Sequence, residues 1–306
     1  MSLPNTAGAL TKGELFPAEL VPEFFNKVKG HSSLAKMCGA SPIPFNGVKE
    51  FTFALDNEVD LVAEGGAKSA GGGTVGSITI LPVKIEYGMR VSDEFLYASE
   101  EVRLNYFQAF VEGWAKKVAR GIDIMAMHGV NPRTGSTAQV LNNNNFDSVV
   151  TNVVEYLASS STANANIEAA IALVQGAEHD VSGAILGNTI RAALAAMTTG
   201  DGYKLFPEMS WGRTPENING LPVDANSTVE FNSALTRAIV GDFANYFKWG
   251  IAKELPVEVI RYGNPDNDSS AGDLAGHNQV YLRGEAYVGW GILDPSAFAL
   301  VAVDDD

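Results

Sequence analysis

The 306-residue sequence contains side chains that could hold a metal ion, but their spacing does not favour a metal site. No two of the four histidines have the H-E-x-x-H spacing that places two ligands on one helix face. Cys38 is the single cysteine, which excludes an intrachain disulfide and a cysteine cluster for zinc. We expect Cys38 to be a small, buried, apolar side chain. The acidic residues 304–306 are interpreted as a solvated chain end.

Two glycine-rich stretches resemble phosphate-binding loops only in part. Residues 71–76 match the dinucleotide pattern G-x-G-x-x-G, yet residues 77–82 favour a strand instead of the helix that would hold a pyrophosphate. Residues 66–69 resemble the end of a P-loop, but Lys68 follows an alanine where the motif has glycine. A flexible hairpin tip accounts for both stretches, and no cofactor is predicted.

The sequence does not support an enzyme. It lacks the G-x-S-x-G nucleophile elbow, and no pair of acidic residues stands out as a general acid and base. A hydrolase with an unrecognised site stays as an alternative from a different functional class. A discrete monomer with a deep pocket of acidic side chains of perturbed pKa would favour that alternative.

The overall charge argues against a protein that reads nucleic-acid sequence. The formal net charge is -15 and the pI is about 4.7, so the average surface repels phosphate. Apolar runs such as residues 192–197 are far shorter than the ~20 residues of a membrane-spanning helix. The first six residues lack the basic start and apolar block of a secretory signal. We therefore expect a cytosolic product without membrane association.

Hydrophobic periodicity predicts an N-terminal arm followed by a long hairpin. In the arm, residues 17–28 carry a helical apolar stripe that includes Phe24 and Phe25. Alternation over residues 51–63 and again over residues 83–91 predicts a two-stranded projection with a glycine-rich tip. A ribbon of this length is marginal alone and exposes backbone edges, so we expect it to lie on a partner surface.

A long amphipathic helix is predicted over residues 92–128. Ser92 is its expected N-cap, and apolar residues recur every three or four positions along it. At about 1.5 Å per residue, the helix would be on the order of 50 Å long. Glycine and proline at residues 129–132 end it.

The remainder of the chain mixes short helices and strands, so the predicted class is α+β. Helices are expected at residues 149–157, 167–178 and 188–197; strands at 183–187, 237–240, 246–252, 257–262 and 280–292; and polar loops at 159–166, 198–219 and 264–276.

Short phrases along the chain add to this order of elements. They are F-P-A-E at residues 16–19, S-L at 33–34, V-A-E-G-G-A-K at 62–68, P-V-K at 82–84, V-S-D-E-F-L at 91–96, the segment 122–135, G-L-P-V at 220–223 and I-V-G-D-F at 239–243. Over nearly the whole chain, their order resembles the major capsid proteins of tailed double-stranded-DNA bacteriophages. Those proteins have the Hong Kong-type capsid fold, which encapsulins share.

The resemblance implies a subunit that assembles into pentamers and hexamers of an icosahedral shell around the phage genome. Its implied divisions are an N-terminal arm at residues 1–40; a peripheral domain at 41–145 with an extended hairpin loop at 49–90 and a spine helix at 92–128; an axial domain at 146–264; and strands at 265–306 that return to both domains. The hairpin would lie over a neighbouring subunit, and axial loops would meet at the five-fold and six-fold axes.

Seven residues are predicted to contact neighbouring subunits: Phe24, Phe25, Glu64, Lys68, Lys84, Glu86 and Arg90. Some family members join a hairpin lysine to an asparagine of another subunit through an isopeptide bond. Lys68 occupies the matching position, but no asparagine or assisting acid is identified. Because a lysine that is not desolvated is a poor nucleophile, we expect an ordinary interface or solvent lysine.

The resemblance also implies partners and a location. The partners are further copies of the chain, a portal, and a separate scaffolding protein, because the cleaved scaffolding segment of some family members has no counterpart here. Packaged DNA would be enclosed without sequence-specific binding, in a virion assembled in the host bacterial cytoplasm. An encapsulin, a cellular shell that stores enzymes, is the nearest alternative. However, the small, polar start of the chain lacks the aromatic cargo-binding helix usual in that family.

Overall fold

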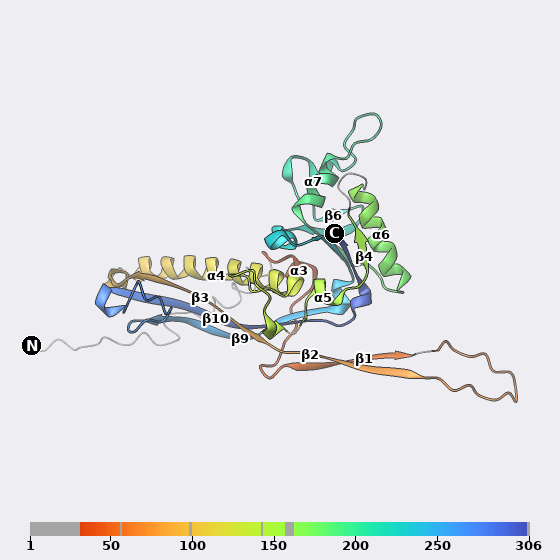
Figure 1. Ribbon diagram of the computed structural model, residues 1–306, viewed down its shortest axis with the longest axis horizontal. Helices are drawn as coiled ribbons and strands as arrows, with labels where there is room; N and C mark the ends of the chain where they lie inside the picture. Colours follow the sequence, from red (N-terminus) through yellow and green to blue (C-terminus); the bar gives the residue numbers. More distant parts are fainter. Residues whose placement is uncertain (1–30, 56, 98–99, 142, 157–161, 305–306) are drawn as a thin grey trace, which may run out of the picture.

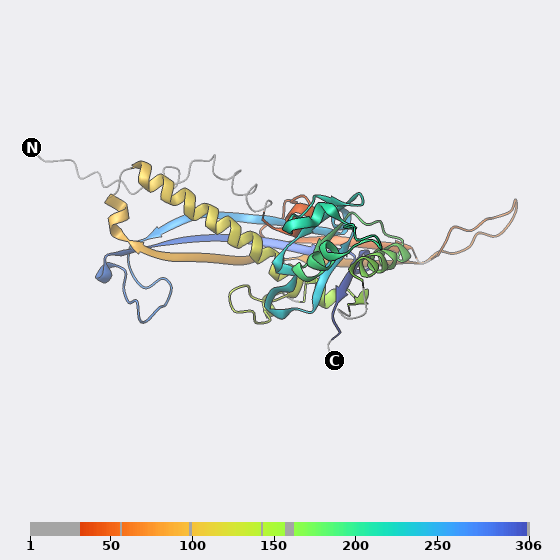
Figure 2. The ribbon, with the colours of Figure 1, turned by 90° about the horizontal axis from the view of Figure 1, so that it is seen from above.

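The computed structural model describes residues 31–55, 57–97, 100–141, 143–156 and 162–304 of the chain. They form an elongated α+β molecule in which a long helix lies along a three-stranded sheet (Figures 1 and 2). A unit with a six-stranded sheet rises at one end of this long layer, and a two-stranded hairpin extends beyond that end (Figure 1). The predicted arm helix over residues 17–28, with Phe24 and Phe25, lies outside the described residues.

The long layer consists of α4 and an antiparallel sheet of order β3-β10-β9. Its elements are α4 (Glu100–His128), β3 (Val83–Ser92), β10 (Gln279–Ile292) and β9 (Phe247–Ile260). The apolar stripe predicted for this helix is buried at six positions, Phe107, Val111, Trp114, Val118, Ile122 and Met125, whereas Leu104, also predicted to belong to it, is 41% exposed. The helix comes close to β10 at Gly284, where a β-carbon would lie 3.0 Å from the Trp114 ring. A residue with a β-carbon at this position would therefore require the Trp114 ring to shift.

The predicted start of the long helix was wrong, although its end at His128 is confirmed. Ser92 is the last residue of β3 and pairs with Gln279 of β10. The 3₁₀ helix η1 (Asp93–Tyr97) follows it, and the Asp93 amide donates to the Asn278 carbonyl at 2.9 Å. The local capping pattern thus yields to strand pairing with a segment far along the sequence.

The hairpin is formed by β1 (Val48–Leu55) and β2 (Gly73–Ile80), which pair in antiparallel register from Val48↔Ile80 to Leu55↔Gly73. The predicted return strand, residues 83–91, was wrong because those residues form β3 of the long layer. Pro82 separates β2 from β3, and its missing N–H cannot continue a ladder. The side chains of Ile85 and Val91 also pack against the core of the long layer. The strand-paired part of the hairpin therefore ends at Ile80.

The six-stranded unit has the sheet order β4-β11-β8-β5-β7-β6. Its strands are β4 (Val153–Glu155), β11 (Phe298–Ala302), β8 (Thr236–Gly241), β5 (Gly183–Leu186), β7 (Leu221–Ala225) and β6 (Asn217–Ile218). The helices α6 (Ala163–Gly176) and α7 (Asn188–Ala196) pack on one face. Alternation along β8 sends Ala238 and Val240 into the core beneath these helices, and Ile239 into the core shared with α4. One face of the six-stranded sheet thus shares a core with the long layer, and the other face forms a second core with α6 and α7.

Shorter elements connect these parts. They are α3 (Ser33–Met37), η2 (Gln139–Leu141), α5 (Phe146–Val149), η3 (Pro207–Gly212), η4 (Ser227–Ser233), α8 (Phe243–Tyr246), η5 (Ala275–His277) and η6 (Pro295–Ala297). Cys38, which follows α3, is buried as expected.

Periodicity predicted the strongest elements of the second half correctly and several others wrongly. The predicted helices at 167–178 and 188–197 and the strands at 183–187, 237–240 and 280–292 are confirmed as α6, α7, β5, β8 and β10. The predicted helix at 149–157 was wrong, because α5 ends at Val149 and β4 follows, paired in parallel with β11. The two predicted strands at 246–252 and 257–262 form the single edge strand β9, whose register against β10 shifts between Leu255 and Glu258, around Pro256. The predicted axial range, 146–264, includes β9, which lies in the long layer.

Candidate assembly surfaces

One face of the hairpin carries large apolar side chains that point to solvent. Phe51, Phe53 and Leu55 alternate along β1, and Val75 of β2 lies opposite Phe53. Their side chains are 72%, 68%, 73% and 66% exposed, in that order. Val59 and Leu61, beyond the strand, are also almost fully exposed. A contiguous apolar face of this kind marks a surface that contacts a partner.

The base of the hairpin is anchored to the long layer. Ile80 is fully buried there, and a β-carbon on Gly291 of β10 would lie 2.6 Å from its Cγ1 atom. An ion pair of 2.9 Å between Glu50 of β1 and Lys248 of β9 adds a second tie. The hairpin is therefore fixed at one end and projects at the other (Figure 1).

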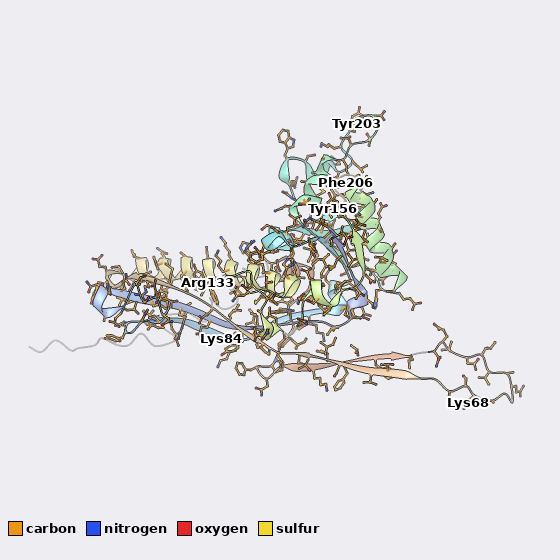
Figure 3. All side chains as sticks on the ribbon, in the orientation of Figure 1. Lys68, Lys84, Arg133, Tyr156, Tyr203 and Phe206 are labelled. Carbon is orange, nitrogen blue, oxygen red and sulfur yellow. The ribbon has the colours of Figure 1, made fainter. Side chains whose placement is uncertain are left out.

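The connection between β1 and β2 holds two of the predicted contact residues, Glu64 and Lys68. Both are exposed, and Lys68 lies near the outer end of the projection (Figure 3). A turn shapes this segment, since the Gly66 amide donates to the Ala63 carbonyl at 2.8 Å and Gly65 has φ of 80°. Contact of Glu64 and Lys68 with a neighbouring subunit stays a prediction.

Three further predicted contact residues, Lys84, Glu86 and Arg90, alternate along β3. Lys84 forms an ion pair of 2.8 Å with Glu285 of β10, and this hydrogen bond raises the pKa of the Lys84 ammonium. Glu86 lies opposite Glu285 in the strand register and is exposed. Arg90 has its partners in residues 264–279 of the same chain. A role of the three in contacts between subunits stays a prediction.

Arg90 organises the loop that joins β9 to β10. Its guanidinium donates to both carboxylate oxygens of Asp266, at 2.8 Å from Nε and 2.6 Å from Nη2. Further bonds reach Asn264, Ala271, Gly272 and Gln279. The hydrogen bond from Arg90 is the main cause that lowers the pKa of Asp266 to about 2. One side chain thus positions a loop of more than ten residues.

The junction between α4 and the six-stranded unit buries a carboxylate. Asp123 of α4 has no exposed surface and accepts five hydrogen bonds. The donors are the Ser32 hydroxyl, the amides of Ser33 at 2.9 Å and Leu34 at 3.3 Å, the Asn226 side chain at 3.2 Å and the Thr228 hydroxyl at 3.3 Å. Burial raises the pKa of Asp123 to about 6 against the opposing effect of these bonds. The carboxylate therefore holds the start of α3 and the start of η4 on one helix.

His128, five residues after Asp123 and at the end of α4, supports the same junction. Its Nδ1 lies 2.6 Å from the Asp147 carboxylate and its Nε2 lies 2.8 Å from the Thr228 carbonyl. Because both ring nitrogens face acceptors, the pair favours the doubly protonated imidazolium. Burial lowers the pKa of His128, but the hydrogen bond and the charge of Asp147 outweigh it, so the pKa is raised. Thr228 thus connects both Asp123 and His128 of α4 to η4.

Sequence reasoning did not find this junction. The available signal was a single acidic residue, Asp123, inside the apolar run from Ile122 to Met127. An unpaired charge at such a position is costly, so its presence indicates buried donors.

In the part of the chain that the structure describes, no group of three metal-ligating side chains occurs. No described helix has the length and apolar character needed to cross a membrane.

Comparison with known proteins identifies a family and solved structures to which this architecture is similar. Residues 12–303 match the Phage capsid family. A chain of Mycobacterium phage Ogopogo has 28% sequence identity and a TM-score of 0.76, with 90% of this chain and 92% of that chain covered. A chain of Gordonia phage Cozz has 21% identity and a TM-score of 0.70, with coverage of 90% and 87%. The capsid of an empty GTA particle, computed with C5 symmetry, has 16% identity and a TM-score of 0.61, with 90% of each chain covered. No curated protein matches the chain.

The chain belongs to the Phage capsid family, which its match over residues 12–303 shows. It is a head shell protein with the Hong Kong-type capsid fold. The family and the fold are those of structural capsid proteins. None of these findings favours the encapsulin alternative. The chain is a component of the virion and assembles with copies of itself.

Proposed function

We propose that the chain builds pentamers and hexamers of an icosahedral head, and that its hairpin clasps the neighbouring subunit. The observation that carries this proposal is the apolar face of the hairpin, on which Phe51, Phe53 and Leu55 are each about 70% exposed. In an isolated subunit this face stays in water. Covered by a second copy, it supplies the free energy of assembly.

The magnitude of this free energy explains why the shell needs several contacts per subunit. Burial of the six large exposed apolar side chains of the hairpin would contribute on the order of 10 kcal/mol. They are Phe51, Phe53, Leu55, Val59, Leu61 and Val75. Association costs about 4–15 kcal/mol in translational and rotational freedom, so one hairpin contact leaves little net affinity. The net charge of -15 adds repulsion between copies, which salt screens. Closed assembly therefore follows when each subunit makes several such contacts at once.

We further propose the partners that this role requires. A separate scaffolding protein and a portal direct closure, and DNA fills the shell without sequence-specific contacts. The acidic surface supports enclosure without tight binding, because it repels phosphate. The GTA capsid, to which this fold is similar, was computed with C5 symmetry, and this supports rings of subunits. Assembly takes place in the cytoplasm of the host bacterium.

The test is light scattering and negative-stain electron microscopy on the purified chain, alone and with a candidate scaffolding protein from the same gene cluster. We expect rings or closed particles of uniform size, favoured by higher salt. A strict monomer under all conditions and at high concentration would contradict the proposal. Shells that form without scaffold and contain an enzyme would instead support an encapsulin.

A further inference from the structure

The densest group of basic residues in the sequence lies in the middle of α4. Lys116, Lys117 and Arg120 are three of the 21 lysines and arginines, and no other five consecutive residues contain three of them. Between residues 102 and 122, Glu112 is the single acidic residue. In a chain with a net charge of -15, this group forms a local region of the opposite charge.

Helix geometry places this basic group on the outer face of α4. Lys116 follows the buried Phe107 by nine residues, which is two and a half turns, so the two side chains point in opposite directions. Lys116 and Lys117 are exposed, and a β-carbon on Gly113 would meet no atom within 4 Å. In the view from above, α4 lies in front of the three-stranded sheet (Figure 2). The group is thus accessible to a partner that approaches from this side.

The positive charges of this group are not neutralised within the subunit. In the part of the chain that the structure describes, none of the three side chains forms an ion pair. Arg120 donates to the Ser227 hydroxyl at 3.0 Å, and its guanidinium lies 5.8 Å from the centroid of the Phe231 ring. Both contacts hold the guanidinium, but neither cancels its charge. The group can therefore make charge-assisted hydrogen bonds to an anionic partner.

Two basic side chains on the opposite face of the three-stranded sheet differ in this respect. On β10, Gly284 faces Trp114 of α4, so Arg283 and Glu285 point to the other side of the sheet. There, Arg283 pairs with Glu285 at 3.3 Å, and Lys84 pairs with the same carboxylate at 2.8 Å. The hairpin also lies on this side, whereas α4 and the six-stranded unit lie on the other (Figure 1). These two basic groups are thus neutralised within the chain, and the three of α4 are not.

The chemistry of the α4 surface fits the phosphate groups of nucleic acid. Ala109 and Gly113, the exposed residues within two turns before Lys116, lack the large side chains that anchor most protein contacts. Lysine and arginine bind phosphate oxygens without reading the sequence of bases. Three such contacts give weak, salt-dependent binding, which agrees with a chain whose average surface repels phosphate. The many copies in one shell would multiply the effect.

We propose that Lys116, Lys117 and Arg120 of α4 contact the phosphate backbone of the enclosed double-stranded DNA. This inference rests on the proposed function and adds a binding surface to it. The contacts carry no sequence specificity. They also place the α4 side of the long layer toward the interior of the shell, and the hairpin side toward the exterior.

Amine footprinting of assembled particles tests the contact directly. Filled heads, heads emptied of DNA, and scaffold-containing particles without DNA are treated with an acetylating reagent, and the modification of each lysine is measured by mass spectrometry. We expect Lys116 and Lys117 to react several-fold more slowly in filled heads than in emptied heads, because phosphate groups shield their amines. Lys253 of β9, which is also exposed, should react equally in both.

A matched pair of variants tests the charge of the surface. Lys116→Gln/Lys117→Gln and the control Lys253→Gln/Arg261→Gln make the same change in net charge at exposed positions. Fluorescence anisotropy of a short DNA duplex measures binding to the unassembled subunit as the salt concentration is varied. The slope of log K against log salt should be about -3 for the wild type and about -1 for the α4 variant, since each phosphate contact contributes about -0.9. The control should keep the wild-type slope.

The outcomes separate this inference from the proposed function. Equal reactivity of Lys116 and Lys117 in filled and emptied heads would overturn the inference and leave the proposed function standing. Slow reaction only in scaffold-containing particles would also overturn it, and would assign the surface to an acidic protein. Equal salt slopes in all three proteins, or no binding of the duplex by the wild type at low salt, would contradict it as well. Failure of the wild-type chain to assemble under any condition would overturn both.

Discussion

The hairpin and the junction around Asp123 each reverse the usual distribution of polar and apolar groups, in opposite ways. The hairpin exposes Phe53 and Leu55 to water, whereas the junction buries a carboxylate among backbone amides and hydroxyls. The junction resolves its anomaly within the chain, because five donors satisfy Asp123. The hairpin does not, because its apolar face stays in solvent. The body of the subunit is thus complete by itself, and the hairpin is complete only on a partner.

The largest effects should come from a matched pair of phenylalanines. Phe146 is fully buried, with its ring centroid 5.0 Å from that of Phe298 and 5.6 Å from that of Phe247. We expect Phe146→Ala to lower the free energy of unfolding of the subunit by about 3–5 kcal/mol. Phe53→Ala, at a side chain that is 68% exposed, should change it by no more than about 0.5 kcal/mol. Urea unfolding of the unassembled subunit measures both.

Assembly should rank the same two variants differently. Phe53→Ala should reduce the yield of closed particles although its subunit is as stable as the wild type. Equal loss of subunit stability in both variants would mean that the hairpin belongs to the folding unit, and the contrast between the two regions would fail.

An intermediate effect on the free energy of unfolding is expected from Asp123→Asn, and its size should depend on pH. The pKa of Asp123 in the folded subunit is about 6, above its usual value of 3.8, so folding binds a proton more tightly. The stability that this group contributes is complete below pH 4 and is lost as the pH rises to about 6. The difference between the two pKa values corresponds to on the order of 3 kcal/mol.

Unfolding curves of both proteins between pH 4 and pH 7 isolate this contribution. The wild-type subunit should lose stability relative to Asp123→Asn as the pH rises, because asparagine does not ionise. If the two curves ran parallel across this range, Asp123 would not be the buried, ionised group described above.

The smallest effect on the stability of the subunit is expected from Arg90→Lys. Lysine keeps the charge but cannot donate to both oxygens of Asp266 and to the carbonyls of Ala271 and Gly272 at once. Hydrogen exchange of residues 264–273 should become faster, while the thermal midpoint of the subunit stays the same. The pKa of Asp266 should also rise from about 2 toward its usual value. Unchanged exchange in this loop would show that Arg90 does not organise it.

Strong periodicity made several elements predictable from sequence. Other elements were not predictable, because they depend on which distant segments pair with each other. The stripe of α4 and its end at His128 follow from repeated apolar positions and the glycine after them. The partner of β1 does not, because residues 73–80 and 83–91 both alternate. The choice depends on Pro82 and on β10, which lies about two hundred residues further along the chain.

The candidate sites show the same limit. Lys84 and Arg90 were predicted to contact neighbouring subunits as part of the return strand of the hairpin, whereas the structure places them in β3 with partners in β10 and in the β9–β10 loop. Asp123 gave only the local signal of one charge in an apolar run.

The most direct test of the central claim is to replace residues 56–72 by Asn-Gly. Leu55 and Gly73 are paired across the hairpin, so a two-residue turn can join the strands without changing their register. We expect a subunit with the wild-type circular dichroism spectrum and thermal midpoint that forms no closed particles in electron microscopy. Closed particles of normal size from this variant would contradict the account, because the projecting part of the hairpin would then not be needed for assembly.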